Sequence, residues 1–207
     1  MLMSELATRT GVPVPTIKYY LREGVLTPGR ATSATRAEYG EPHVERIALV
    51  KALSGHGLSL AKIKAIVGLI DSPEASLLEA LGAATSALPP ASESAADTDY
   101  PRARAAFATL GRPLPADLPA VAQFEQALTD AEAAGLPMDE DRLRAYSPHI
   151  TAIAAYEIDR MPLESPAAAI EYAVLGTVLY EPILAALRRI IHAELTAERL
   201  ASHLGNG

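Results

Sequence analysis

The sequence predicts a mainly α-helical chain with one small β-hairpin close to its N-terminus. Apolar residues recur three and four positions apart along most of the 207 residues, which is the periodicity of amphipathic helices. A stretch rich in Pro, Gly and Arg interrupts this pattern at residues 25–39, and no strand pattern appears after Tyr39. With 49% apolar residues the chain can bury a core, and its length allows one domain or two.

The first fifth of the chain, residues 3–39, has the pattern of a helix-turn-helix followed by a wing. Two short amphipathic helices flank the Gly11-Val12 turn, and Pro15 suits the first turn of the second helix because a proline has no N–H to leave unpaired there. Ile17 and Leu21 form the buried side of that helix. Residues 25–39 are expected to form the wing, a small hairpin.

The second helix leaves polar and aromatic side chains outside its buried side. Cations, a hydroxyl and phenols on one short helix can neutralise phosphates and reach base edges in the major groove of DNA. One of its two adjacent tyrosines must turn toward the core. The candidate DNA contacts of this helix are Thr16, Lys18, Tyr19, Tyr20 and Arg22.

Three further cations are candidate DNA contacts. Arg30 and Arg36 of the wing are expected to meet the DNA backbone or minor groove, and a solvated basic loop is the alternative. Lys62 stands three residues after Ser59, the expected N-cap of another helix, where an acid would be usual. It either contacts phosphate or is an ordinary exposed side chain.

Charge divides the chain into two parts. Residues 1–70 contain nine Lys or Arg against five Asp or Glu, a net charge of +4, whereas residues 71–207 have a net charge of −11. A basic N-terminal part favours phosphate, and an acidic remainder keeps nucleic acid away from the rest of the molecule.

The run TIKYYLREGVLTPGR at residues 16–30, RAEY at 36–39 and GLSLAKI at 57–63 resemble the DNA-binding domain of the MerR family of bacterial transcriptional regulators. The resemblance covers about residues 1–70 and supports the contact of Arg36 with DNA. It implies a homodimer that grips a pseudo-palindromic promoter operator, with recognition helices in successive major grooves and wings on the flanking backbone. It also implies that the protein distorts promoter DNA so that RNA polymerase can engage it.

The expected domain organisation has four parts. Residues 1–71 form the DNA-binding domain, 72–88 a dimerisation helix, 89–99 a flexible linker without large apolar residues, and 100–207 an all-helical effector-binding or dimerisation domain. In the MerR resemblance the helix at 72–88 pairs with its twin, whereas an ordinary core helix is the alternative. Whether dimerisation uses this helix or the C-terminal body stays open. The candidate dimerisation residues of the helix are Leu77, Leu78, Leu81 and Leu88.

Beyond the linker, helices are expected at residues 101–110, 117–134, 139–161 and 166–204, with Pro148 and Pro182 kinking or splitting the last two. The segment 169–195 is apolar around most of its circumference, so it is either the centre of the body or a subunit interface.

Aromatic and polar groups on the apolar faces of this body are candidate ligand contacts. Tyr172, Gly176 and Tyr180 recur every four residues, so two phenols flank a gap on one face. His149 and Glu157 lie about 12 Å apart along a helix, too far to share a metal ion. The candidates, each of which could instead be a core-edge residue, are Tyr146, His149, Tyr156, Tyr172 and Tyr180.

Other functions are not indicated. No motif of a phosphate loop, a zinc protease or a serine nucleophile is present, so we expect no enzyme, no cofactor and no metal. The chain has no Cys, no signal-peptide pattern and no apolar stretch near the roughly 20 residues of a membrane span, so a cytoplasmic protein is expected.

The sequence thus favours a one-component regulator controlled by a small hydrophobic or aromatic effector in the helical body. A ligand-independent DNA-bound adaptor or repressor, whose body recruits a protein partner, is the main alternative. A chiefly structural helical protein is a third possibility, but the charge division argues against it.

Overall fold

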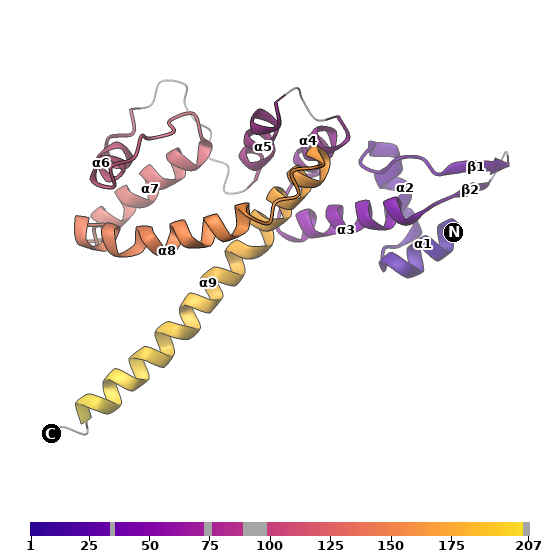
Figure 1. Ribbon diagram of the computed structural model, residues 1–207. Coiled ribbons are helices and arrows are strands. Elements are labelled where there is room, and N and C mark those ends of the chain that lie inside the picture. The colour runs from indigo at the N-terminus through magenta and orange to yellow at the C-terminus, as the bar shows by residue number, and fades with distance from the viewer. Residues whose placement is uncertain (34–35, 73–75, 89–98, 205–207) are drawn as a thin grey trace.

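The computed structural model describes residues 1–33, 36–72, 76–88 and 99–204. The chain is extended rather than spherical: a winged N-terminal head and a helical unit lie at opposite ends, and the last helix runs between them and projects outward (Figure 1). In the described residues the elements are α1 (Met3–Thr10), α2 (Val14–Glu23), β1 (Arg30–Ser33), β2 (Arg36–Glu38), α3 (Glu41–Gly55), α4 (Leu60–Asp71), α5 (Leu77–Ser86), α6 (Pro101–Thr109), α7 (Pro119–Ala133), α8 (Glu140–Ile158) and α9 (Pro166–Leu204). The mainly α-helical fold class with a winged helix-turn-helix is confirmed.

The helix-turn-helix packs on a small core of its own. Gly11 ends α1 in the left-handed conformation (φ 65°), as the tight turn requires. Leu6 of α1 and Ile17 of α2 are fully buried, and they pack with Tyr39 and Ile47. Tyr39 therefore lies under the wing, and its contacts fix α2 against α3.

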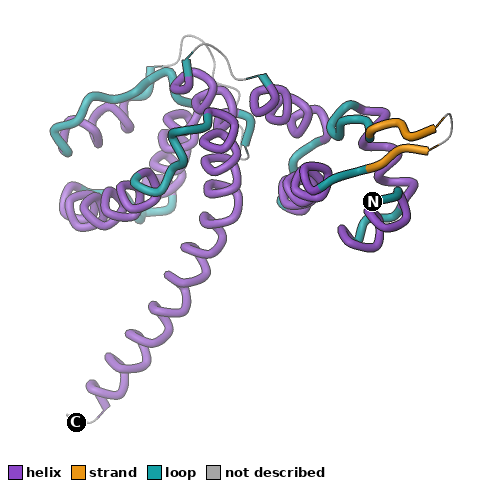
Figure 2. Tube along the Cα trace, turned by 45° about the vertical axis from the view of Figure 1, so that its right-hand side comes forward, coloured by secondary structure: helices purple, strands orange, loops and turns teal. Residues whose placement is uncertain are grey.

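The wing is shorter than the sequence indicated. Strands β1 and β2 pair antiparallel with Arg30 opposite Glu38, and they form the only strands in the described residues (Figure 2). Residues 34–35 at the tip lie outside the described residues. Val25 and Leu26, expected in the wing, are instead 1% and 2% exposed, because these apolar side chains join the cores beneath it.

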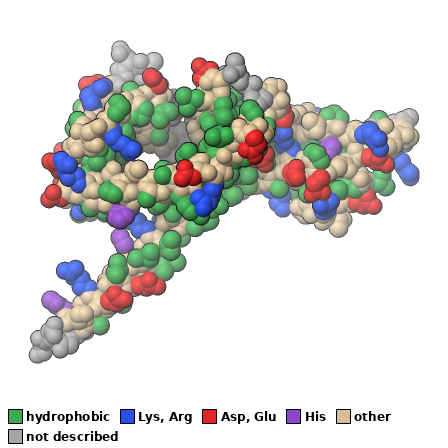
Figure 3. Space-filling model, viewed as in Figure 1, with side chains coloured by type: hydrophobic (Ala, Val, Ile, Leu, Met, Phe, Trp, Pro, Cys, Tyr) green, Lys and Arg blue, Asp and Glu red, His purple; other side chains and the backbone are tan. Residues whose placement is uncertain are grey.

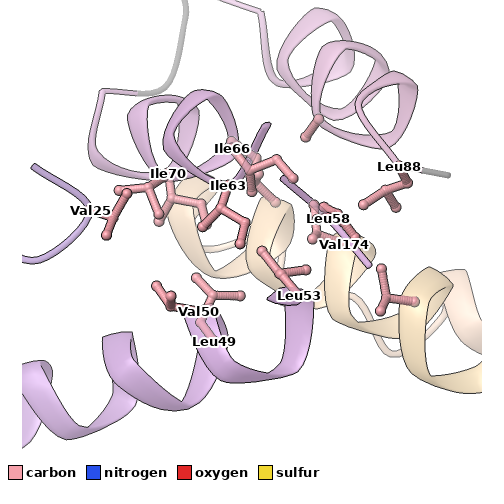
Figure 4. Close-up of a cluster of buried hydrophobic side chains, with 14 of the residues drawn as sticks. Val25, Leu49, Val50, Leu53, Leu58, Ile63, Ile66, Ile70, Leu88 and Val174 are labelled. Atoms are coloured by element: carbon pink, nitrogen blue, oxygen red, sulfur yellow. The ribbon is translucent and has the colours of Figure 1, made fainter. Parts of the chain in front are cut away.

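A second, larger core joins the head to the end of the chain. Leu53 of α3, Ile63 and Ile66 of α4, and Ile170 and Val174 of α9 are all nearly or fully buried in it (Figure 4). Ser59 caps α4 as expected, since its hydroxyl accepts a hydrogen bond from the Lys62 backbone N–H. The first part of α9 is thus a component of the head's core.

An acidic group lies at this junction. Glu171 of α9 is influenced by the charges of Arg46 and Glu45 on α3, and Arg46 pairs with Asp71. Burial raises the pKa of the Glu171 carboxyl, and the Arg46 guanidinium opposes that rise.

Helix α5 begins later than predicted. It starts after Ser76, whose hydroxyl accepts from the backbone N–H of Glu79, rather than after Ser72. Residues 73–75 lie outside the described residues, as do residues 89–98 of the expected linker. The resulting helix has 10 residues, so it is shorter than the helix expected over 72–88.

Helices α6, α7 and α8 form a small unit at the far end of the molecule from the wing (Figure 1). Arg102 of α6 binds Glu132 of α7 at 2.7 Å, and the Glu125 carboxylate accepts the backbone N–H of Ala103 at 2.8 Å. Pro148 and Pro182 were expected to kink or split their helices, and α8 and α9 each continue through the proline, so neither helix is split. A single missing N–H is tolerated because the remaining hydrogen bonds of these 19- and 39-residue helices continue on both sides.

The second part of α9 stands free of the rest of the chain. We name residues 179–204 the arm. Residues 179–203 of the arm are all exposed, and Figures 1 and 2 both show the arm leading away from the other helices. The segment 169–195 is thus divided: its first part lies in the core, its second part is exposed, and a subunit interface on the exposed part stays a prediction.

Helix α9 is also long and apolar enough to cross a membrane by length and composition, with an 18-residue window of mean hydropathy 1.4. This corrects the expectation that no stretch approaches a membrane span. The helix nevertheless places Ile170, Val174 and Val178 in the protein core. Burial within the protein therefore accounts for these apolar residues of α9.

Candidate nucleic-acid interface

Helix α2 presents a polar and aromatic side to solvent. Ile17 anchors its inner side in the core, and Lys18 on the next position is exposed. The guanidinium of Arg22 lies over the ring of Tyr19, 5.1 Å from its centroid, and Tyr19 is 39% exposed. Thr16 is partly exposed at the start of the helix. A cation, a phenol and a hydroxyl thus lie on the outer side of a helix that is fixed from behind.

The two adjacent tyrosines of α2 differ in environment. Tyr20 is half-buried and packs against both cores of the head, whereas Tyr19 faces solvent. The expectation that one of them turns inward is met by Tyr20. The Tyr20 side chain therefore contacts both cores. Tyr19, which faces solvent, is the better placed of the two tyrosines for a DNA contact.

The two arginines of the wing are not equivalent. Arg30 donates to the Glu38 carboxylate across the strand pair at 2.8 Å, and this hydrogen bond, with the positive charge of Arg30, lowers the pKa of Glu38. Arg36 is exposed, and no ion pair with another described residue occupies its guanidinium. Arg36 is thus available to a phosphate without first breaking a contact.

Ion pairs show where the surplus positive charge of the head resides. Arg9 pairs with Glu41 at 2.7 Å, and Arg22, which is 71% exposed, has only a longer contact of 3.4 Å with Glu23. Among the described residues of the head, the lysines and arginines without a carboxylate partner are Lys18, Arg36, Lys51, Lys62 and Lys64. Figure 3 shows basic side chains at the wing end of the molecule.

Lys64 was not singled out by sequence reasoning. Its ammonium lies beside Gly24, 3.9 Å from the position that a Cβ would occupy there, so α4 brings a cation to the C-terminal end of α2. Lys51 instead donates to the Thr10 carbonyl at 3.0 Å, at the end of α1. Lys62 is half-buried at the start of α4. Lys62 and Lys64 are separated in the sequence by Ile63 alone, and this pattern does not indicate which lysine lies near α2.

Three of the five candidate ligand residues line two adjoining hollows in the body. A cavity of about 230 Å³ lies between α5, α8 and α9 and is lined by Leu81, Glu157, Met161, Tyr172, Gly176 and Tyr180, among others. A more open hollow of about 630 Å³ shares Glu157, Tyr172 and Tyr180 and adds Tyr156 and Leu184. Tyr172 donates to the Glu157 carbonyl at 3.1 Å, which fixes its ring.

The other two candidates lie elsewhere on α8. Tyr146 is 45% exposed, His149 is exposed, and neither lines these two hollows. Among the described residues no group of three or more His, Cys, Asp or Glu side chains is arranged to hold a metal ion.

The candidate dimerisation residues of α5 have unequal surroundings. Leu88 is 4% exposed, and Leu77 and Leu81 are partly buried against the core that contains α9 of the same chain. Leu78 is 80% exposed. Most of the leucine seam is therefore already covered within the subunit.

Comparison with known proteins identifies the head. The family model described as MerR HTH family regulatory protein matches residues 1–68. The HTH-type transcriptional regulator ZntR homolog of Haemophilus influenzae is 32% identical over 69 residues, which are 33% of this chain and 51% of that protein. The mercuric resistance operon regulatory protein of Bacillus cereus is 32% identical over 73 residues, 35% of this chain and 55% of that protein. The chain thus spans about half the length of these curated relatives.

A solved structure resembles the whole chain. The crystal structure of SCO5550 from Streptomyces coelicolor A3(2), a candidate transcriptional regulator, superposes with a TM-score of 0.71 and 32% identity. The match covers 96% of this chain and 97% of that one, so the helical body is shared as well as the head. Together with the winged helix-turn-helix at residues 1–68, these similarities show that the chain belongs to the MerR family of DNA-binding transcriptional regulators.

Proposed function

We propose that this regulator acts as a homodimer on a pseudo-palindromic promoter operator, with α2 of each copy in the major groove and the wing on the flanking backbone. The observation that carries the proposal is the outer side of α2. Lys18, Tyr19 and Arg22 are exposed there while Ile17 holds the helix from behind. Arg36 of the wing adds a cation with no carboxylate partner among the described residues.

Tyr19, Lys18, Arg22 and Thr16 would read or position the DNA in the groove, and Arg36 and Arg30 would bind backbone phosphate. Lys62 and Lys64 extend the positive surface to α4. We further infer that the bound dimer bends and untwists the promoter so that RNA polymerase can engage it, in the cytoplasm of a bacterium. Such a deformation requires several kcal/mol, which makes control by a ligand plausible.

The DNA-binding proposal is tested by fluorescence anisotropy with duplex DNA from upstream of the protein's own gene, over a series of salt concentrations. Arg36→Ala is expected to weaken binding at least about tenfold and to reduce the slope of log K against log salt by about 2, because a homodimer loses one phosphate contact at each of its two wings. The matched control is Arg144→Ala, an exposed arginine of α8 far from the wing, which should change neither quantity. Equal binding of the wild type to the native duplex and to a scrambled duplex would contradict sequence-specific recognition.

We also propose that the two hollows around Tyr172 and Tyr180 form an effector site for a small hydrophobic or aromatic compound. Their lining is mostly apolar, and its polar groups are the Glu157 carboxylate, the Arg160 guanidinium and the hydroxyls of the tyrosines, Thr85 and Thr177. The site touches both α9 and α5, and α9 continues into the core of the head. A ligand there could bias the position of the head through one continuous helix.

The effector proposal is tested by melting the protein with a library of aromatic compounds. A compound at 100 times its dissociation constant should add about 2.7 kcal/mol to the free energy of unfolding. Gly176→Phe should abolish this shift because the new ring fills the cavity, whereas Gly68→Phe, on an open surface of α4, should retain it. If no compound shifts the melting temperature of the wild type, the ligand-independent adaptor or repressor becomes the better description.

A further inference from the structure

We propose that the effector site takes a protonated amine, a compound with one or two apolar rings and an ammonium group that still carries N–H donors. The inference rests on the effector site of the proposed function and names the chemical class that this site fits. Neutral, anionic and quaternary compounds of the same shape are expected to bind more weakly.

Three of the four hydroxyl groups that line the smaller cavity donate their protons to backbone carbonyls. Thr85 donates to the carbonyl of the residue four positions before it at 2.8 Å, and Thr177 does the same at 2.9 Å. Tyr172 donates to the Glu157 carbonyl at 3.1 Å. A hydroxyl has one proton and two lone pairs, so these three groups can offer a ligand only an acceptor. The fourth hydroxyl belongs to Tyr180, which is 49% exposed and open to water.

Among the described residues, the only charged group that lines the smaller cavity is the Glu157 carboxylate. The side chain is partly buried, and none of the ion pairs between described residues includes it. A carboxylate accepts hydrogen bonds and cannot donate one. Because a charged donor binds a carboxylate about twice as strongly as a neutral donor binds a neutral acceptor, a ligand ammonium gains most at this position.

The apolar part of the smaller cavity sets the size of the ligand. It includes Leu81, Ile158, Met161 and Gly176. The cavity volume of about 230 Å³ is below the roughly 300 Å³ at which pockets for drug-sized ligands begin, so one or two rings fill it. Glu157 lines both hollows. The ring therefore occupies the smaller cavity, and the ammonium lies where the two hollows meet.

The open hollow contains a cation that is already engaged. The Arg160 guanidinium lies over the Tyr156 ring, 3.4 Å from its centroid, and donates to the Tyr156 carbonyl at 3.0 Å. Arg160 lines the open hollow and not the smaller cavity. Its contact with Tyr156 also shows that a phenol ring of this hollow can hold a cation over its face. A ligand carboxylate in the smaller cavity would instead be repelled by Glu157.

The test is isothermal titration calorimetry of the full-length protein with four probes that share one ring system. The probes are 2-naphthylmethylamine, its N,N,N-trimethyl analogue, 2-naphthylmethanol and 2-naphthoate. The amine is expected to bind at least about tenfold more tightly than each of the others, because it alone combines a positive charge with N–H donors.

Glu157→Gln should raise the Kd of the amine about 10- to 100-fold, because the amide keeps the size of the side chain and removes its charge. The same variant should leave the Kd of the alcohol unchanged. The matched control is Glu164→Gln, at an exposed glutamate before α9 that lines neither hollow, and it should alter no affinity. Thermal melting followed by circular dichroism checks that both variants remain folded.

The outcomes separate the possible failures. A trimethyl analogue that binds as tightly as the amine overturns the requirement for N–H donors. A naphthoate that binds most tightly, and that loses affinity in Arg160→Gln, overturns the cationic class; in both cases the effector site itself stands. Binding of the amine that survives Gly176→Phe places it elsewhere and overturns the inference. If none of the four probes binds, the inference is wrong, and the aromatic library decides separately on the effector site.

Discussion

Replacing Leu53 by alanine is expected to lower the free energy of unfolding by about 2–5 kcal/mol, as deletion of a fully buried leucine side chain leaves a cavity. Leu53 is 0% exposed in the core that α3 shares with α4, α5 and α9. Because one core connects the head to α9, the lower stability should be seen in the unfolding of the head and of α9 together. Urea unfolding at fixed protein concentration, followed by circular dichroism, measures it.

The control for this substitution is Leu78→Ala. The same atoms are removed there from a side chain that is 80% exposed, so the change should stay within about 0.5 kcal/mol. A similar loss at both positions would contradict the burial of Leu53. An early transition confined to the head would contradict the shared core.

The second large effect is expected at Gly29, where the wing begins. A Cβ at this position would lie 2.7 Å from the Glu38 carbonyl oxygen and 2.8 Å from the Tyr39 ring. Neither backbone nor a buried ring can give way easily, so Gly29→Ala should push β1 away from β2 and cost about 1–3 kcal/mol. Because the wing carries Arg30 and Arg36, affinity for the operator should fall at least about tenfold in the anisotropy assay.

Gly55→Ala is the matched control for the wing variant. Gly55 ends α3 with nothing within 4 Å of a built Cβ and without a positive φ. Alanine there should preserve DNA binding and slightly stabilise the helix, by about 0.5–1 kcal/mol. Wild-type affinity for Gly29→Ala would show that the wing does not contribute to binding.

Local signals were sufficient to predict the head. The turn at Gly11, the buried Ile17, the Ser59 cap and the hairpin between Arg30 and Glu38 depend on residues close in sequence. The ranges of the last four helices were also close, since Pro residues and caps mark their ends. The predicted start of α5 at residue 72 was wrong, since Ser76 accepts the capping hydrogen bond from the Glu79 N–H.

The placement of α9 could not be read from periodicity. An apolar circumference is the same pattern whether a helix is buried or exposed. In α9, Ala169, Ile170, Val174 and Val178 are buried, whereas residues 179–203 are exposed. The surroundings of the candidate DNA contacts also could not be predicted from the sequence alone. Composition placed Arg30 and Arg36 in one wing, but only the strand register shows that Glu38 engages Arg30.

The order in which the chain is synthesised has a consequence for the core that joins the head to α9. Ile63 and Ile66 are made more than 100 residues before Ile170 and Val174, against which they pack. At about 5–20 residues per second, a ribosome needs roughly 5–20 s to cover that interval. Throughout it, the apolar surface of α3 and α4 has no α9 to cover it, and the nascent head is exposed to chaperones and proteases. A chain that terminates early would therefore lack the part of this core that α9 supplies, and its head would be less stable than the head of the complete chain.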